Sequence, residues 1–203
     1  MRPDRRALAA ASIALSLIGV VAVVALHVLR PDLAPISHRL SEYAIGTYGG
    51  VMTAAFVCVG ASLLTLAAAI VAADRRLCSR VTAVAIGLAG VGMVLSGVYR
   101  TDVSRSGATA DALHSAASGL ATLALIGAAV FWTAVTSRRA APVVLATMGL
   151  ALGAVSPALH RSRWSGLSQR LLWVTLLAWV IVAAFELTHR HSASNRPTRA
   201  GSA

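Results

Sequence analysis

The chain has 203 residues, of which 57% are apolar and only 12% are charged, and its formal net charge at pH 7 is +11. An ordinary soluble domain carries about 25% charged residues, so these proportions exclude that class of protein. They indicate an integral membrane protein.

Six apolar stretches are long enough to cross a bilayer, because a helix of about 20 residues spans the hydrocarbon core. The first is too long for a typical signal peptide and lacks an Ala-x-Ala cleavage pattern, so we expect it to be retained. None shows the period-two alternation of a barrel strand. The sequence therefore predicts an all-α bundle of six transmembrane helices, at residues 7–29, 48–73, 80–99, 112–136, 142–160 and 167–188. We expect a single domain over residues 1–190, followed by a basic, disordered cytoplasmic tail, 191–203.

All 18 basic residues are arginine, and they are unevenly divided between the two sides of the membrane. Eleven fall on the side of the termini: Arg2, Arg5, Arg6, Arg75, Arg76, Arg80, Arg138, Arg139, Arg190, Arg196 and Arg199. Seven fall on the other side: Arg30, Arg39, Arg100, Arg105, Arg161, Arg163 and Arg170. Because the side richer in arginine and lysine faces the cytoplasm, we expect both termini to be cytoplasmic and the chain to be a multi-pass protein of the plasma membrane.

The first outer connector contains the unusually polar stretch PISHRLSEYAIG, residues 35–46. If this stretch is helical, Ser37 lies one turn from Ser41, and His38 lies one turn from Glu42. Arg39 is expected at the level of the lipid headgroups. We interpret the stretch as a polar cover over the outer mouth of the bundle, held there by protein rather than by lipid.

The fourth and sixth spans also begin with polar side chains. Asp111, His114, Ser115 and Ser118 follow the spacing i, i+3, i+4 and i+7, which places them on one helix face. Arg170 lies in the first turn of the sixth span, where the helix dipole disfavours a cation. We therefore expect a carboxylate from the first or second outer connector to pair with it.

Three parts of the chain carry distinctive motifs: RPDLAPISHRLSEYAIGTYGGVM, GVYRTD followed by ADALHSAAS, and SGLSQRLLW. They resemble a family of membrane proteins from bacteria and archaea known as domain of unknown function 998, and the resemblance covers essentially the whole chain. It implies about six spans. Tyr99-Arg100 departs from the Phe-Pro expected before Thr-Asp. The motif positions fall on Pro35, Ile36, Ser37, Ser41, Thr101, Asp102, His114, Gln169 and Arg170.

Two functions are compatible with this pattern. The first is binding or movement of a lipid headgroup or small polar solute at an outer site of Ser37, Ser41, Glu42, Asp102, His114, Gln169 and Arg170, since converging ionisable groups at a membrane boundary are typical of such sites. The alternative is a metal-dependent intramembrane hydrolase acting on a lipid-like substrate. Its candidate ligands are His38, Asp102, His114 and His160, but no His-x-x-x-His pair supports it. In a purely structural interpretation, Asp102, His114 and Arg170 form a hydrogen-bonded network that only holds the hairpins together. Whether the chain is an enzyme stays open.

The expected partners are membrane lipids. The basic tail lacks aromatic residues that could stack on bases, so we expect no nucleic acid, and nothing in the sequence calls for a cofactor. Trp132, Trp164 and Tyr43 fall near predicted interfaces and fit an aromatic belt. Small residues let helices approach closely, so the glycine-rich faces are expected to pack against helices of this chain or, alternatively, to form a homo-oligomer. These faces contain Gly87, Gly90, Gly92, Gly97, Gly149 and Gly153.

Overall fold

The computed structural model of the chain describes residues 4–99, 109–136 and 139–189, and these residues are helical apart from connecting loops. Six helices are long and apolar enough to cross a membrane, so the chain is an all-α multi-pass membrane protein. No helix end differs from its predicted position by more than three residues. The elements are α1 (Arg5–Leu29), a short 3₁₀ helix η1 (Leu40–Ala44), α2 (Gly49–Ala73), α3 (Leu77–Val98), α4 (Thr109–Thr136), α5 (Ala140–Leu159) and α6 (Ser165–His189).

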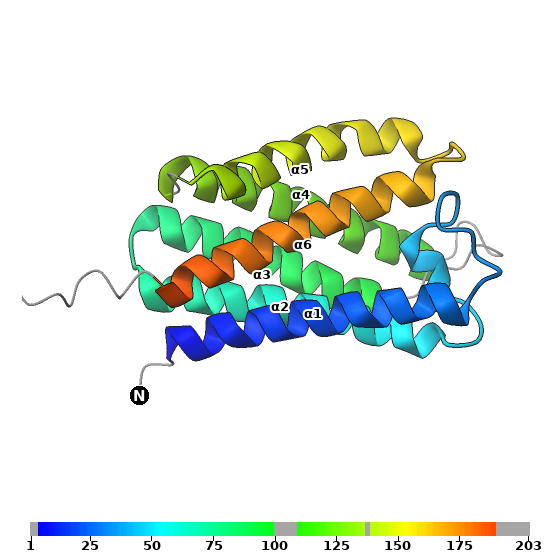
Figure 1. Cartoon of the computed structure of the whole chain (residues 1–203), viewed down its shortest axis with the longest axis horizontal. Coiled ribbons are helices and arrows are strands. Elements are labelled where there is room, and N and C mark those ends of the chain that lie inside the picture. Colours follow the sequence, from blue (N-terminus) through cyan, green and yellow to red (C-terminus); the bar gives the residue numbers. More distant parts are fainter. Residues whose placement is uncertain (1–3, 100–108, 137–138, 190–203) are drawn as a thin grey trace, which may run out of the picture.

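The helices form an up-and-down bundle in which each packs against its neighbours in sequence, and α6 returns to pack against α1 (Figure 1). The start of α1 and the end of α6 lie at the same end of the bundle, as an even number of spans requires. The opposite end carries the loop of residues 30–48 and the start of α6, and we refer to it as the loop end. The arginine count predicts that the loop end faces away from the cytoplasm.

Helix α1 has polar side chains inside and apolar ones outside, the reverse of a helix in a soluble protein. Ser12 and Ser16 are fully buried, whereas Val21 is 66% exposed. The Ser62 hydroxyl of α2 lies 3.1 Å from the Ser12 hydroxyl and 2.7 Å from that of Ser16, and donates to the Ser12 carbonyl. Hydrocarbon provides no hydrophobic drive between helices, so such hydrogen bonds and close packing hold α1 against α2.

Most of the glycines on the predicted packing faces contact other helices of the same chain. A Cβ on Gly90 would lie 2.9 Å from the Gly60 carbonyl oxygen, and a Cβ on Gly60 would lie 2.7 Å from that of Gly90, so α2 and α3 approach as closely as backbones allow. Gly92 approaches α4 in the same way. A Cβ on Gly87 would meet nothing within 4 Å. Of the four glycines of α3, Gly87 is therefore the one whose face a second copy of the chain could use.

The aromatic-belt prediction is wrong for two of its three residues. Tyr43 is 1% exposed and Trp132 is 3% exposed, so both belong to the protein interior. Trp164, at 42% exposure, remains accessible as a belt residue must be. Position along a span does not reveal which way a ring points, because that depends on how the helix packs.

Candidate functional site

The 30–48 loop is folded on itself by one arginine and one tyrosine. Arg30 donates from Nε and Nη2 to the Asp32 carboxylate, and from Nη1 to the Ile45 carbonyl at 2.7 Å. The Arg30 guanidinium thereby lowers the pKa of the Asp32 carboxyl. The buried Tyr43 hydroxyl donates to the Leu33 carbonyl at 2.8 Å. The Arg30 contact joins the start of the loop to its end, and the Tyr43 contact joins its first part to its last part.

The start of α6 fastens the same loop to the bundle. The Ser165 hydroxyl donates to the Ser37 carbonyl at 2.8 Å, and the backbone N–H of Leu167 donates to the Ile36 carbonyl at 3.0 Å. A Cβ on Gly166 would collide with the carbonyl oxygen of His38, so this position needs a residue without a side chain. The chain therefore places a glycine where the loop backbone and the helix come closest.

Arg170 is the centre of this contact. Its four acceptors are the carbonyl oxygens of Pro35 at 2.7 Å, His38 at 2.6 Å and Gly166 at 3.0 Å, all reached by Nη1, and Nε2 of His27, reached by Nε at 3.0 Å. His27 can accept because its Nδ1–H donates to a carbonyl of its own helix. Among the described residues Arg170 forms no ion pair, and its partners there are uncharged oxygens and an imidazole. The expected pairing with a carboxylate of the second outer connector, Asp102, falls outside the described residues and stays a prediction.

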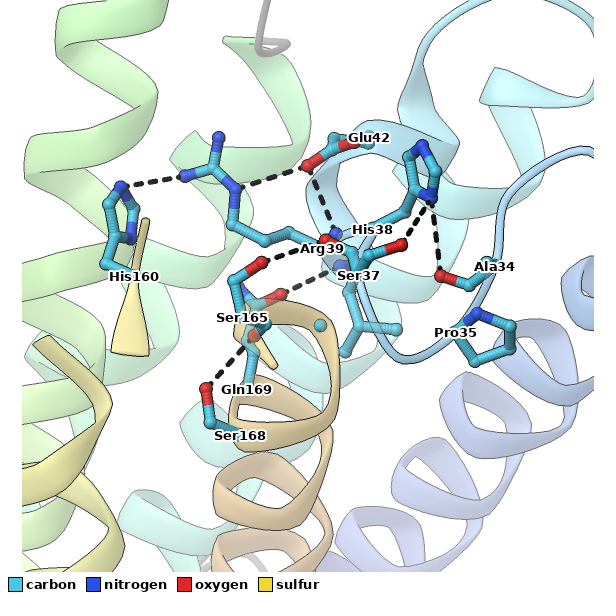
Figure 2. A network of polar contacts seen from close by, with 12 residues as sticks. Ala34, Pro35, Ser37, His38, Arg39, Glu42, His160, Ser165, Ser168 and Gln169 are labelled. Carbon is cyan, nitrogen blue, oxygen red and sulfur yellow. Dashed lines mark hydrogen bonds and ion pairs between the residues drawn. The ribbon is translucent and has the colours of Figure 1, made fainter. Parts of the chain in front are cut away.

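A second network lies beside it (Figure 2). Arg39 Nε contacts Glu42 Oε1 at 3.3 Å, the same oxygen accepts from the Arg39 backbone N–H, and Arg39 Nη1 lies 3.2 Å from His160 Nε2. Residues 40–44 form a 3₁₀ helix and the residues before them form turns, unlike the longer helix considered from the sequence. As a result Glu42 pairs with Arg39 rather than with His38, whose Nδ1 lies 3.3 Å from the Ala34 carbonyl.

Arg39 and His160 border an open crevice of ≈ 510 Å³ between η1, α4, α5 and α6, which we call the polar crevice. Hydroxyl groups are the commonest polar groups on its walls, and two imidazoles, one amide and one guanidinium add further hydrogen-bonding groups. None of the lining residues is acidic. The polar lining consists of Arg39, Ser41, His114, Ser115, Ser118, Thr122, Ser156, His160, Ser165, Ser168 and Gln169.

The structure brings together part of the site predicted from the sequence. Ser41, His114 and Gln169 line the polar crevice. His114 is 4% exposed, and its Nδ1 lies 2.8 Å from the carbonyl oxygens of both Ser96 and Tyr99, which joins α4 to the end of α3. Gln169 accepts from the Leu40 backbone N–H at 2.7 Å.

Other predicted residues lie elsewhere. Ser37 is exposed and contributes its carbonyl oxygen, and Glu42 lies outside the lining and acts through Arg39. Arg170 lines a second, mostly apolar cavity, with Gln169 on the wall between the two. Asp102, like Arg100 and Thr101, lies outside the described residues, as does the predicted tail.

No three His, Cys, Asp or Glu side chains within the described ranges are grouped closely enough to hold a metal ion. The hydrolase hypothesis therefore has no ligand set in this part of the chain. Within the same ranges, a serine hydroxyl is hydrogen-bonded to a histidine ring at Ser37 and His38. These two residues are adjacent in the loop and lie outside the crevice. Nothing in this arrangement favours bond cleavage over binding.

Several site residues were missed by sequence reasoning. Ser156, Ser165 and Ser168 line the crevice, and His27 contacts Arg170. The repeated serines in SGLSQR carried a usable signal, because a membrane helix rarely begins with so many hydroxyls without partners for them. No comparable signal marked His27, which lies at the end of an apolar span and 143 residues from Arg170 along the chain.

Comparison with known proteins identifies the family. The model of the family described as "Protein of unknown function (DUF998)" matches residues 11–186, which contain four of the six spans entirely and most of α1 and α6, so the chain belongs to this family. The resemblance inferred from the motifs is confirmed. The same comparisons found no similar chain among curated proteins and none among solved structures.

Proposed function

We propose that this DUF998 protein binds a polar ligand, either a lipid headgroup or a small polar solute, in the polar crevice. We also propose that it resides in the plasma membrane with the loop end facing outward. One observation carries the proposal: a crevice of ≈ 510 Å³ with walls rich in hydroxyl, imidazole and amide groups opens at the end of an otherwise apolar bundle. Polar groups at membrane depth are costly unless they have partners, so their accumulation around an open space favours a ligand.

The charges of the crevice indicate what kind of ligand it suits. Its cation, Arg39, is already paired with Glu42 and contacts His160, so the crevice has little net charge to offer. Hydroxyls and amides both donate and accept hydrogen bonds. A ligand with several hydroxyl or amide groups of its own matches this lining better than a strongly charged one.

The walls also allow the ligand to carry an acyl chain. Thr122 and Leu123 lie on the part of α4 that lines the crevice, and Leu123 is 72% exposed. The part of the crevice farther from the loop end is therefore open toward the hydrocarbon of the membrane. A headgroup could enter from the membrane, whereas a solute would enter from the loop end. Both sources share the same hydrogen-bonding chemistry in the crevice.

The test compares what the purified protein retains. Ser118→Phe fills the crevice, whereas Leu120→Phe adds the same ring at a 52% exposed position of the same helix outside the lining. After purification in a mild detergent, mass spectrometry of the organic and aqueous extracts identifies bound lipids and solutes separately. We expect wild type and Leu120→Phe to retain a polar molecule that Ser118→Phe loses. Identical extracts from all three folded proteins would contradict the proposal.

A further inference from the structure

A second cavity lies between α1 and α6, backed by α2 and by Met93 of α3. Its volume is ≈ 200 Å³ and its walls are almost entirely apolar, so we call it the apolar cavity. An engineered protein cavity of about 150 Å³ with similar walls stays dry and binds benzene. The apolar cavity is therefore large enough for a run of methylene groups. Its walls include Val20, Val23, Val24, Phe56, Val174 and Leu177.

The mouth of the apolar cavity faces the membrane. Val24 of α1 and Val174 of α6 both line it, yet they are 59% and 66% exposed, so they stand at its edge. Both helices span the bilayer, and the surroundings of these valines are lipid acyl chains. A chain can enter sideways between α1 and α6 without leaving hydrocarbon.

The end of the cavity nearest the 30–48 loop is polar and positively charged. Arg170, His27 and Gln169 line it there. The four acceptors of Arg170 are all uncharged, and its Nη2 is buried with no hydrogen-bond partner, while the guanidinium lies 5.5 Å from the centre of the Tyr43 ring. Glu42 is an electrostatic neighbour of Arg170, but its carboxylate is already paired with Arg39. A cation that is half withdrawn from water and forms no ion pair with a described residue favours an anion from outside the chain.

We propose that the apolar cavity binds one acyl chain of an anionic membrane lipid, whose negatively charged headgroup lies beside Arg170. The length of the chain beyond the cavity continues into the bilayer between Val24 and Val174. This site is distinct from the polar crevice, although Gln169 and Trp173 border both. The proposal does not depend on what the crevice binds.

Photo-cross-linking tests the proposal on the full-length protein in phosphatidylcholine vesicles. The probe is phosphatidylglycerol with a diazirine in one acyl chain, and the labelled residues are mapped by mass spectrometry of peptides. We expect labels to concentrate on cavity residues such as Val20 and Leu177. Even labelling of these positions and of the outward-facing Val21 and Val28 would overturn the proposal.

A matched pair of variants tests occupancy. Val23→Phe narrows the cavity, whereas Val21→Phe adds the same ring to the lipid-facing side of the same helix. We expect Val23→Phe to reduce cavity labelling by about tenfold, because displacing two methylene groups forfeits roughly that factor. Val21→Phe should label as wild type does. Unchanged labelling of Val23→Phe would overturn the assignment of the cavity.

Competition tests the charge of the lipid without altering Arg170. Unlabelled phosphatidylglycerol should reduce cavity labelling at lower concentrations than unlabelled phosphatidylcholine with the same acyl chains. Equal competition would overturn the proposal, because the chain alone would then account for binding. Neither Val23 nor Val21 lines the polar crevice, so retention of a crevice ligand should be the same in both variants. The two proposals can therefore fail separately.

Discussion

Replacing Arg170 with methionine should loosen the attachment of the 30–48 loop to α6. Three of the hydrogen bonds of Arg170 reach other segments of the chain: Pro35, His38 and His27. A hydrogen bond from a charged donor contributes about 1.5–3 kcal/mol. Taking the lower value for each, less what methionine regains by packing, we expect the free energy of unfolding to fall by about 3 kcal/mol.

The assay is unfolding by sodium dodecyl sulfate in mixed micelles, with hydrogen exchange of residues 33–45 as a local measurement. Exchange in the loop should accelerate more than exchange within the helices, because two of the three lost contacts, those to Pro35 and His38, belong to the loop. Arg163→Met is the control. The Arg163 guanidinium lies 5.0 Å from the centre of the Trp164 ring, and the loss of such a contact costs below about 1 kcal/mol. If Arg170→Met is no more destabilising than Arg163→Met, Arg170 does not hold the loop.

Two further predictions concern helix packing and acid. Gly90→Ala should lower the free energy of unfolding by about 1–3 kcal/mol, since the added Cβ would press on the Gly60 carbonyl. Gly87→Ala on the same helix should be neutral or stabilising by up to about 1 kcal/mol. Equal effects of the two variants in the same micelle assay would refute the close approach of α2 and α3 at Gly90. Asp74 accepts a hydrogen bond from the Arg76 backbone N–H, which lowers the pKa of the Asp74 carboxyl in the folded protein. The stabilisation from this carboxylate is therefore full above its unfolded pKa of about 3.9 and is lost as pH falls through the lower folded pKa. Asp74→Asn should therefore reduce the difference in stability between pH 7 and about pH 3; an unchanged difference would exclude Asp74 as its source.

The spans and the polar end of the bundle could be predicted because their signals are local. Transfer of about 20 consecutive apolar residues into hydrocarbon is favourable whatever the rest of the chain does, so the six helices follow from composition alone. The polar residues at the starts of α4 and α6 are local signals too. Together with the polar stretch of residues 35–46, they placed Ser41, His114 and Gln169 at one end of the bundle, and all three border the polar crevice.

The partners of those residues could not be predicted, because they depend on contacts between distant segments. Arg170 and the His38 carbonyl are 132 residues apart, and no local pattern indicates that this backbone oxygen would receive the guanidinium. Tyr43 was expected at the lipid interface and is buried, because the loop that carries it folds inward over the bundle. Burial of a ring is decided by its packing partners.

The sequence by itself determined that this protein lies in a membrane, how many times it crosses, and at which end its unusual polar residues gather. Only the tertiary structure decided that these residues divide between two spaces. His114 borders a hydroxyl-lined crevice among α4, α5 and α6, and Arg170 closes an apolar cavity between α1 and α6. The physical reason is that hydropathy fixes the depth of each helix in the bilayer, whereas its rotation and neighbours are set by side-chain packing across the bundle.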